Sequence, residues 1–182
     1  MGDSVLLLDS GKSLFKGKNK KTNIPLIQAR GIAKAYMVMG YDAVAISASD
    51  IENGEDFLEE TLNEGFPWVS ANLVDKNGEP VSKPYVIKTI NSLKVAIIGL
   101  TETLSPSSKF SILDYAKPLT GLLKQLTSES ESDIIILLSN RKRCSKYRST
   151  PKEYPKQPPQ LCSVFKRGSL ERRFQAQQET GG

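Results

Sequence analysis

Three aspartates and one Gly-Lys-Ser loop are the residues whose types and spacing could do chemistry in this sequence. Asp9, Asp42 and Asp50 each lie near the carboxyl end of a predicted strand, where α/β proteins gather catalytic groups. Carboxylates in that position can bind hard cations. A single carboxylate at a strand end more often caps the helix or turn that follows, so both roles stay open for these aspartates.

Gly11, Lys12 and Ser13 follow a predicted strand and look like the end of a phosphate-binding P-loop. The full pattern needs a glycine five residues before Gly11, and that position holds Leu6 inside the strand. Without this glycine the loop cannot wrap its amide groups around a phosphate. The favoured interpretation is a solvated basic loop, whose lysines are Lys12, Lys16, Lys18, Lys20 and Lys21.

The chain of 182 residues contains no histidine and only two cysteines. The missing imidazole excludes a Ser-His-Asp triad, a Cys-His pair and histidine-ligated zinc sites. Cys144 and Cys162 cannot build a four-thiolate metal site by themselves. They are most simply free thiols.

The net charge of +5 is unevenly distributed along the chain. Residues 1–140 hold 14 basic and 17 acidic side chains, whereas residues 141–182 hold 11 basic and 3 acidic ones. The second segment is rich in proline and poor in branched aliphatic residues, so it cannot bury enough apolar surface to offset its ordering entropy. We predict a disordered basic tail at 141–182.

Such a tail could contact polyanions such as nucleic acid, but no folded nucleic-acid-binding motif frames it, and an incidental basic tail is favoured.

The start of the chain lacks the basic and long apolar regions of a signal peptide. No apolar stretch is long enough for a transmembrane helix. Taken as written, the sequence predicts a cytoplasmic location without a membrane span and leaves the oligomeric state open.

Apolar segments alternate between strand-like and helix-like periodicity over the first 140 residues. This alternation, with short turns, predicts an α/β layered fold. Asn91 and Ser92 join two of the strands in a tight hairpin. The predicted strands are 5–9, 42–46, 68–73, 85–89, 95–100 and 134–138, and the predicted helices are 25–39, 55–62 and 113–126.

Four stretches occur in order along the chain, with 134–139 as the next core strand: Val-Leu-Leu-Leu-Asp-Ser-Gly (5–11), Met-Gly-Tyr-Asp-Ala-Val-Ala (39–45), Phe-Pro-Trp-Val-Ser-Ala-Asn-Leu (66–73), and 84–87 with 93–101. They resemble the calcineurin-like metallophosphoesterase domain of the 5′-nucleotidase/UDP-sugar hydrolase family. The resemblance implies an α/β sandwich of mixed sheets flanked by helices, with a two-metal phosphohydrolase site at the strand ends and a periplasmic or extracellular location for full-length members.

The resemblance fails at the positions where the family holds its metals. The family's bridging Gly-Asp is Gly11-Lys12 here. Its Gly-Asn-His-acid motif, which supplies a metal ligand and the catalytic histidine, is Ser-Ala-Ser-Asp here, so Ser49 replaces the histidine and Asp50 alone remains. Its Leu-Ser-His ends in Asn140. The family's Asp-x-His would lie before Met1, and its Gly-His-x-His in the sequence that the tail replaces.

These substitutions predict a degenerate, partial domain over residues 1–140 that lacks the family's first strand and its C-terminal strands. An ammonium group at Lys12 beside each metal charge would cost on the order of 4 kcal/mol at ~4 Å and an effective dielectric near 20. We therefore predict no bound metal and no phosphohydrolase activity, although the family uses two divalent metals. Asp50 is the remnant of the site, and the degenerate positions are Lys12, Ser49, Asp50 and Asn140.

Two further interpretations stay open from the sequence. The chain could be a non-catalytic module that binds phosphate or nucleotide weakly through backbone amides and the Lys12 loop, or an interaction module whose basic tail contacts polyanions. The abrupt change of composition after Asn140 is also what a shifted reading frame would produce.

Overall fold

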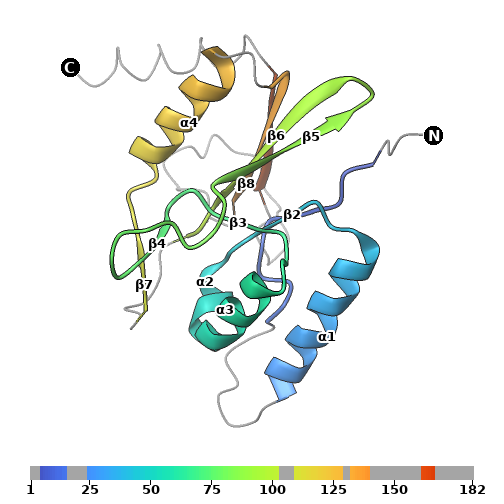
Figure 1. Cartoon of the computed structure of the whole chain (residues 1–182), viewed down its shortest axis with the longest axis vertical. Helices are drawn as coiled ribbons and strands as arrows, with labels where there is room; N and C mark the ends of the chain where they lie inside the picture. Colours follow the sequence, from blue (N-terminus) through green and yellow to red (C-terminus); the bar gives the residue numbers. More distant parts are fainter. Residues whose placement is uncertain (1–4, 16–23, 103–108, 129–131, 140–160, 167–182) are drawn as a thin grey trace, which may run out of the picture.

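The computed structural model describes residues 5–15, 24–102, 109–128, 132–139 and 161–166 (Figure 1). Strands and helices alternate through most of this part of the chain. The strands are β1 (Leu8–Asp9), β2 (Ala43–Ala45), β3 (Trp68–Val69), β4 (Leu73–Asp75), β5 (Tyr85–Ile90), β6 (Leu93–Leu100), β7 (Phe110–Ile112), β8 (Ile134–Ser139) and β9 (Leu161–Lys166), and the helices are α1 (Ile24–Met39), α2 (Ala48–Asn53), α3 (Glu55–Asn63) and α4 (Ala116–Ser128).

The strands form three sheets. In the parallel sheet, β2 lies between β1 and β3 and runs parallel to both. The mixed sheet has the order β5-β6-β8-β9, in which β6 and β8 are parallel and the two outer strands are antiparallel to their neighbours. A small sheet pairs β4 with β7 in antiparallel fashion. The predicted α/β class with mixed strands is confirmed.

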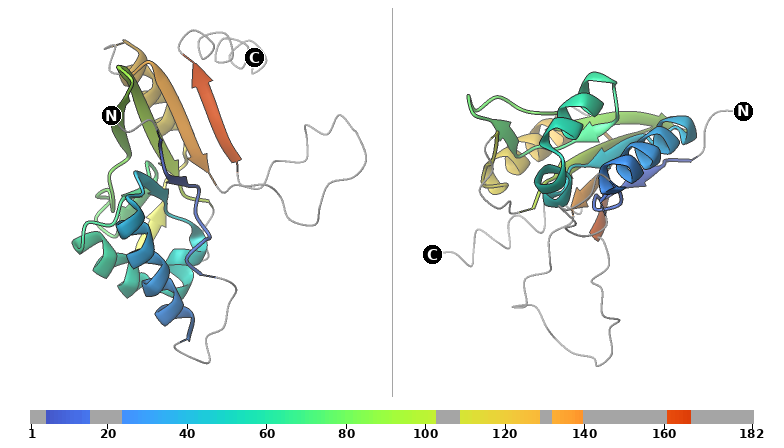
Figure 2. Two further views of the ribbon diagram at one scale, coloured as in Figure 1. Left: turned by 90° about the vertical axis from the view of Figure 1, so that its right-hand side faces the viewer. Right: turned by 90° about the horizontal axis from the view of Figure 1, so that it is seen from below.

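The two larger sheets pack face to face, with helices on their outer faces (Figure 2). Alternate residues of a strand point to opposite faces, and β2 follows this rule: Ala43 and Ala45 pack against the mixed sheet, whereas Val44 faces the cluster beneath α1 and α3. In β6, Ile97 faces the parallel sheet and Ile98 faces α4. The result is a helix–sheet–sheet–helix sandwich.

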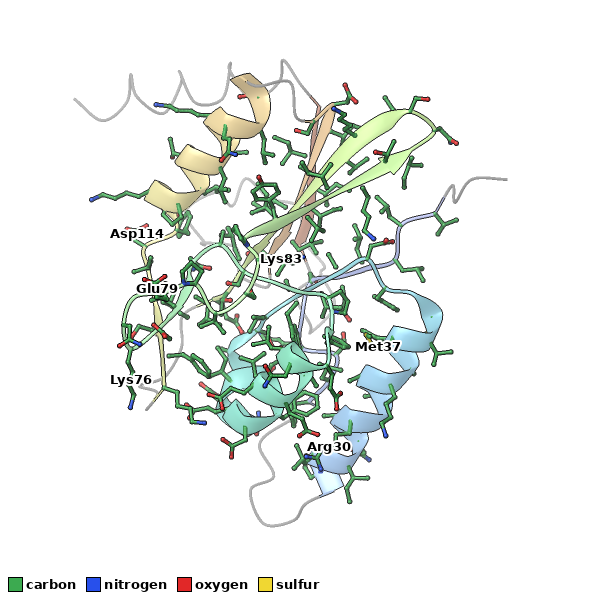
Figure 3. All side chains as sticks on the ribbon, in the orientation of Figure 1. Arg30, Met37, Lys76, Glu79, Lys83 and Asp114 are labelled. Carbon is green, nitrogen blue, oxygen red and sulfur yellow. The ribbon has the colours of Figure 1, made fainter. Side chains whose placement is uncertain are left out.

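Helices α1 and α3 cover the outer face of the parallel sheet. Phe57 and Leu58 of α3 are fully buried in that cluster. The indole N–H of Trp68 donates a hydrogen bond of 2.9 Å to Thr61 Oγ1, which ties α3 to β3. On the solvent side, Arg30 of α1 forms an ion pair of 2.6 Å with Glu60, while the exposed Met37 lies near the other end of the same helix (Figure 3).

Several elements differ from the sequence predictions. The predicted strand 68–73 is split, because Ala71 donates its amide to Gly99 and the chain then enters the small sheet as β4. The predicted hairpin is present, with Asn91 and Ser92 both in the left-handed region at φ 47° and 68°. Helix α2 and strand β7 were not predicted, and α4 begins three residues later than expected.

The C-terminal segment supplies one described element. Strand β9 pairs antiparallel with β8, with Val164 opposite Ile136 in register. The predicted disorder of residues 141–182 is not decided by this one pairing and stays a prediction. Residues 140–160 and 167–182 lie outside the described part of the chain, and the proposed boundary between 1–140 and 141–182 stays a prediction. Among the described helices, none is long and apolar enough to cross a membrane.

The two large sheets approach each other most closely where Gly99 of β6 faces Val69 of β3. A β-carbon at Gly99 would lie 2.1 Å from the carbonyl oxygen of Val69 and 2.6 Å from its carbonyl carbon. These are backbone atoms in a buried strand, so they cannot move aside as a flexible side chain would. A glycine is therefore required here by the distance between the sheets rather than by its own backbone angles.

Replacing Gly99 with alanine is expected to lower the free energy of unfolding by about 3 kcal/mol or more, since the sheets must separate locally. Urea denaturation followed by tryptophan fluorescence measures the change. Gly31 in α1 provides the matched control, because a β-carbon there meets nothing within 4 Å. Gly31→Ala should raise the free energy of unfolding by about 0.5–1 kcal/mol. Equal unfolding midpoints for Gly99→Ala and the wild-type protein would contradict this account.

Candidate functional site

The carboxyl ends of β1, β2, β3 and β6 meet in one region of the sandwich. Parallel pairing places the ends of β1, β2 and β3 at the same edge of their sheet. The segment after β3 joins the end of β6 through the hydrogen bond of 2.9 Å from the Ala71 amide to the Gly99 carbonyl. Lys12, in the segment after β1, forms an ion pair with Glu102, which lies two residues beyond the end of β6. Side chains that follow these four strands form the candidate site.

Asp9, at the end of β1, uses both of its carboxylate oxygens within the protein. Oδ1 accepts a hydrogen bond of 2.7 Å from the Gly11 amide, which shapes the turn after the strand. Oδ2 accepts one of 2.6 Å from the hydroxyl of Tyr36 in α1. Burial of Tyr36 and this contact with Asp9 raise the pKa of the tyrosine well above its usual value. Of the two roles considered for Asp9, cation binding and capping of the following turn, the structure shows the capping role.

Asp50 lies in the first turn of α2, directly after β2, and is fully buried. Its Oδ2 accepts hydrogen bonds from the Ser47 amide at 2.9 Å and from the Ser47 hydroxyl at 2.6 Å. Its Oδ1 is buried and has no hydrogen-bond partner. Burial raises the pKa of the Asp50 carboxyl to about 6; the contacts with Ser47 oppose this change, and the charges of Asp9 and Glu102 add to it.

Ser49 and Lys12 are also engaged within the protein. The hydroxyls of Ser47 and Ser49 lie 2.8 Å apart. The Lys12 ammonium group lies 2.8 Å from Glu102 Oε1 and 3.0 Å from Oε2, so it contacts both oxygens of that carboxylate. The structure thus brings the predicted residues Lys12, Ser49 and Asp50 to the same strand ends. Asn140, the fourth predicted position, and Cys144 lie outside the described residues.

Asp42 is not part of this region, which corrects the sequence interpretation. It precedes β2 rather than following it, because the strand begins at Ala43. There its Oδ2 accepts the Leu7 amide at 3.1 Å, and its Oδ1 forms an ion pair of 2.9 Å with Lys88. Asp42 therefore lies at the opposite ends of the strands from Asp9 and Asp50.

Sequence reasoning missed a buried polar network beside the site. The Ser70 and Thr101 hydroxyls lie 2.7 Å apart. The Asn72 side chain accepts the Thr101 amide at 2.9 Å and donates to its carbonyl at 3.0 Å. These bonds join the segment after β3 to the segment after β6. The only available signal was that polar residues follow apolar strand segments at 70–72 and 101–102; their pairing depends on tertiary contact.

The described residues do not fit a two-metal centre. Among them, no group of three or more histidine, cysteine, aspartate or glutamate side chains is arranged to hold a metal ion. Both Asp9 oxygens and one Asp50 oxygen are already bound to protein donors, and the Glu102 carboxylate is bound to an ammonium group. A cation entering this region would have to displace Lys12 and compete with these contacts.

The fold and the order of its elements are those of a known class of hydrolases. The structure is similar to the calcineurin-like phosphoesterase YfkN of Bacillus subtilis, with a TM-score of 0.61 over 79% of this chain and 50% of that one, at 21% sequence identity. It is also similar to a 5′-nucleotidase precursor of Thermus thermophilus, with a TM-score of 0.58, 25% identity, and coverage of 76% of this chain and 28% of that one.

Curated sequences point to the same relationship. The 5′-nucleotidase of Vibrio cholerae serotype O1 is 36% identical over 153 residues, which cover 76% of this chain and 26% of the relative. Protein UshA of Escherichia coli K12 is 30% identical over 147 residues, which cover 74% of this chain and 26% of the relative. No protein-family model matches the chain.

This chain is homologous to part of the metallophosphoesterase domain of the UshA/5′-nucleotidase family. It spans about a quarter of the length of the curated relatives that it matches. The family resemblance inferred from the sequence is thereby confirmed.

The raised pKa of Asp50 predicts a pH-dependent contribution to stability. The native pKa of about 6 exceeds the ordinary value of 3.8, so the folded protein binds this proton more tightly than the unfolded chain does. The resulting stabilisation is fully present below pH 3.8 and is lost as the pH rises through about 6. Its full size is about 3 kcal/mol, because each tenfold difference in proton affinity between the folded and unfolded states contributes about 1.4 kcal/mol.

The variant Asp50→Asn tests this prediction, since its amide oxygen can still accept the Ser47 amide but does not titrate. Relative to the wild-type protein, it should gain about 2–3 kcal/mol of unfolding free energy as the pH rises from about 4 to about 7. Urea denaturation at a series of pH values measures this difference. Glu64→Gln, at an exposed position, controls for the loss of one negative charge. A difference between Asp50→Asn and wild type that is constant with pH would refute the assignment.

Proposed function

We propose that this chain is a metallophosphoesterase-fold domain that does not hydrolyse phosphate esters by the two-metal route. The observation that supports this most directly is the ion pair of 2.8 Å between Lys12 and Glu102 at the strand ends. In two-metal hydrolases, carboxylates and histidines at such a site hold a pair of cations that clamp the attacking and leaving oxygens. Here an ammonium group of the protein engages the carboxylate instead.

The remaining described carboxylates support the same conclusion. Asp9 shapes the turn after β1 and binds Tyr36, whereas Asp50 accepts both donors of Ser47 at the start of α2. The unpartnered Asp50 Oδ1 is buried, so it is not presented to solvent as a ligand. Ser49 carries a hydroxyl that neither titrates near neutral pH nor replaces an imidazole as an acid or base. The described part of the arrangement therefore stabilises the fold and does not supply the acid–base and metal-binding groups that two-metal hydrolysis uses.

The alternative of phosphate or nucleotide binding through the Lys12 loop has less support. Both oxygens of the Glu102 carboxylate already contact the Lys12 ammonium group. A phosphate would have to compete with this internal anion, and it would approach the negative charges of Asp9 and Asp50. That the basic tail binds polyanions stays a prediction, and so does the cytoplasmic location. The substrates of the relatives are not assigned to this chain.

A phosphate-release assay on the full chain tests the proposal. Purified protein is incubated with a 5′-mononucleotide and Mn²⁺ or Zn²⁺, and inorganic phosphate is measured. We expect release no greater than that from Asp50→Asn under the same conditions. A 5′-nucleotidase relative, such as the Vibrio cholerae protein, serves as the positive control. Metal-dependent release from the wild-type chain that disappears in Asp50→Asn, with folding of the variant verified by circular dichroism, would overturn the proposal.

A further inference from the structure

The dipeptide Asn-Gly occurs twice in the chain, at 53–54 and at 77–78. This dipeptide can lose ammonia without an enzyme, because glycine carries no side chain that would hinder attack by its backbone nitrogen on the asparagine side chain. The reaction requires the side-chain carbon Cγ of the asparagine to approach that nitrogen, so a fold that holds the two apart slows it. The structure places the two dipeptides in different surroundings.

Asn77 and Gly78 lie in an exposed turn. Residues 76–80 are all exposed, and Lys76 and Glu79, on either side of the dipeptide, lie at the outer edge of the molecule (Figure 3). Gly78 is in the left-handed region at φ 84°, and a β-carbon there would meet nothing within 4 Å. The side-chain amide of Asn77 donates a long hydrogen bond of 3.3 Å to Asp75 Oδ2. Rotation of this side chain toward the Gly78 nitrogen therefore breaks one weak contact.

Asn53 and Gly54 lie in a packed junction between α2 and α3. The side-chain amide of Asn53 donates a short hydrogen bond of 2.7 Å to the Ser49 carbonyl oxygen. Gly54 is half-buried, and a β-carbon there would lie 2.9 Å from the β-carbon of Phe57 and 3.1 Å from the ring of Phe15. Bringing the Asn53 side chain to the Gly54 nitrogen therefore requires loss of the contact with Ser49 and local opening of the junction.

The attacking nitrogen itself is held in a similar way in both places. The Gly78 amide donates a hydrogen bond of 3.2 Å to the Asp75 carbonyl, and the Gly54 amide donates one of 3.3 Å to the Ile51 carbonyl. Because these bonds are nearly equal in length, they do not distinguish the two dipeptides. The difference lies in the asparagine side chain and in the packing around it.

We propose that Asn77 is a site of spontaneous deamidation and that the fold protects Asn53 from the same reaction. Hydroxide removes the proton of the Gly78 nitrogen, which attacks Asn77 Cγ; the bond between these atoms forms and the bond from Cγ to Nδ2 breaks. The leaving nitrogen takes a proton from water and departs as ammonia, which regenerates hydroxide and leaves a cyclic imide. Water then opens the imide at either carbonyl, giving aspartate or isoaspartate at position 77.

The product changes the turn that follows β4. Asp75 organises this turn: its Oδ1 accepts the amides of Asn77 at 2.8 Å and of Glu79 at 2.9 Å, and its own amide donates to the Glu79 carbonyl at 2.9 Å. In the aspartate product, a second carboxylate replaces the amide that donates to Asp75 Oδ2. In the isoaspartate product, the backbone of the turn is also longer by one carbon atom.

Peptide mapping of the full chain tests the proposal. The folded protein and the same protein unfolded in guanidinium chloride are incubated side by side in mildly alkaline buffer. Both are then digested under mildly acidic conditions, and mass spectrometry detects replacement of the amide NH₂ by OH in each Asn-Gly peptide. In the folded protein we expect Asn77 to react at least about tenfold faster than Asn53, because reaction at Asn53 first needs a local opening. In the unfolded protein the two rates should become similar, since the packing that protects Asn53 is absent.

The variant Asn77→Gln is the matched control. Its longer side chain would have to close a six-membered ring, which forms far more slowly, so the change in this peptide should disappear while Asn53 behaves as in the wild-type protein. The proposal is overturned if Asn77 stays unmodified in the folded protein, or if Asn53 reacts there as fast as Asn77. It is also overturned if the ratio of the two rates is the same in the folded and unfolded protein, because the flanking sequence would then explain the difference. None of these outcomes depends on the phosphate-release assay.

Discussion

The close contact between the two large sheets is the constraint on which the other features depend. Gly99 lies so near the Val69 backbone that no side chain fits between them, and small residues such as Ala43 and Ala45 face the same interface. This proximity lets the Ala71 amide bond to the Gly99 carbonyl. It thereby places the segments after β3 and β6 side by side. The polar groups of the candidate site lie close together because the two large sheets pack against each other.

The chemistry of that site follows from how its charges are satisfied. Buried polar groups in proteins need partners, and here nearly all of the described ones find them within the chain: Asp9 with Gly11 and Tyr36, and Glu102 with Lys12. Asp50 is the exception, with one oxygen bonded to Ser47 and the other unpartnered. A site whose charged groups are bound to partners within the protein in this way stabilises the fold. It leaves the described carboxylates little capacity to bind cations from solvent, and this is the basis of the proposal that the chain does not use two-metal chemistry.

Homology and local chemistry therefore give different kinds of information about this protein. The relatives in Vibrio cholerae and Escherichia coli establish the origin of the fold over about three-quarters of the chain. The fold by itself permits many functions. The choice among them depends on the side chains at the strand ends. Lys12 follows β1 and Ser49 lies beside Asp50 in α2, at the positions where the family resemblance predicts that metal-site residues are replaced.

Local patterns in the sequence were sufficient for much of the architecture. The apolar runs before Asp9 and at 134–138, and the hairpin at Asn91-Ser92, were predicted because strand periodicity and turn chemistry act over a few residues. The capping role considered for Asp9 and Asp50 is also local, since each bonds to a residue two or three positions away. The substitutions expected at Lys12 and Ser49 rest on a comparison of motifs and stay predictions.

Contacts between distant residues could be decided only by the tertiary structure. The partner of Lys12 is Glu102, the partners of Asn72 lie beyond β6, and the pairing of β4 with β7 splits the predicted strand 68–73. Asp42 shares the sequence pattern of Asp9 and Asp50, but β2 begins at Ala43, so Asp42 lies at the other end of the strands. The sequence thus determined which groups the chain carries and which it lacks. The packing of one sheet on the other determined which of them touch, because those distances depend on the whole fold.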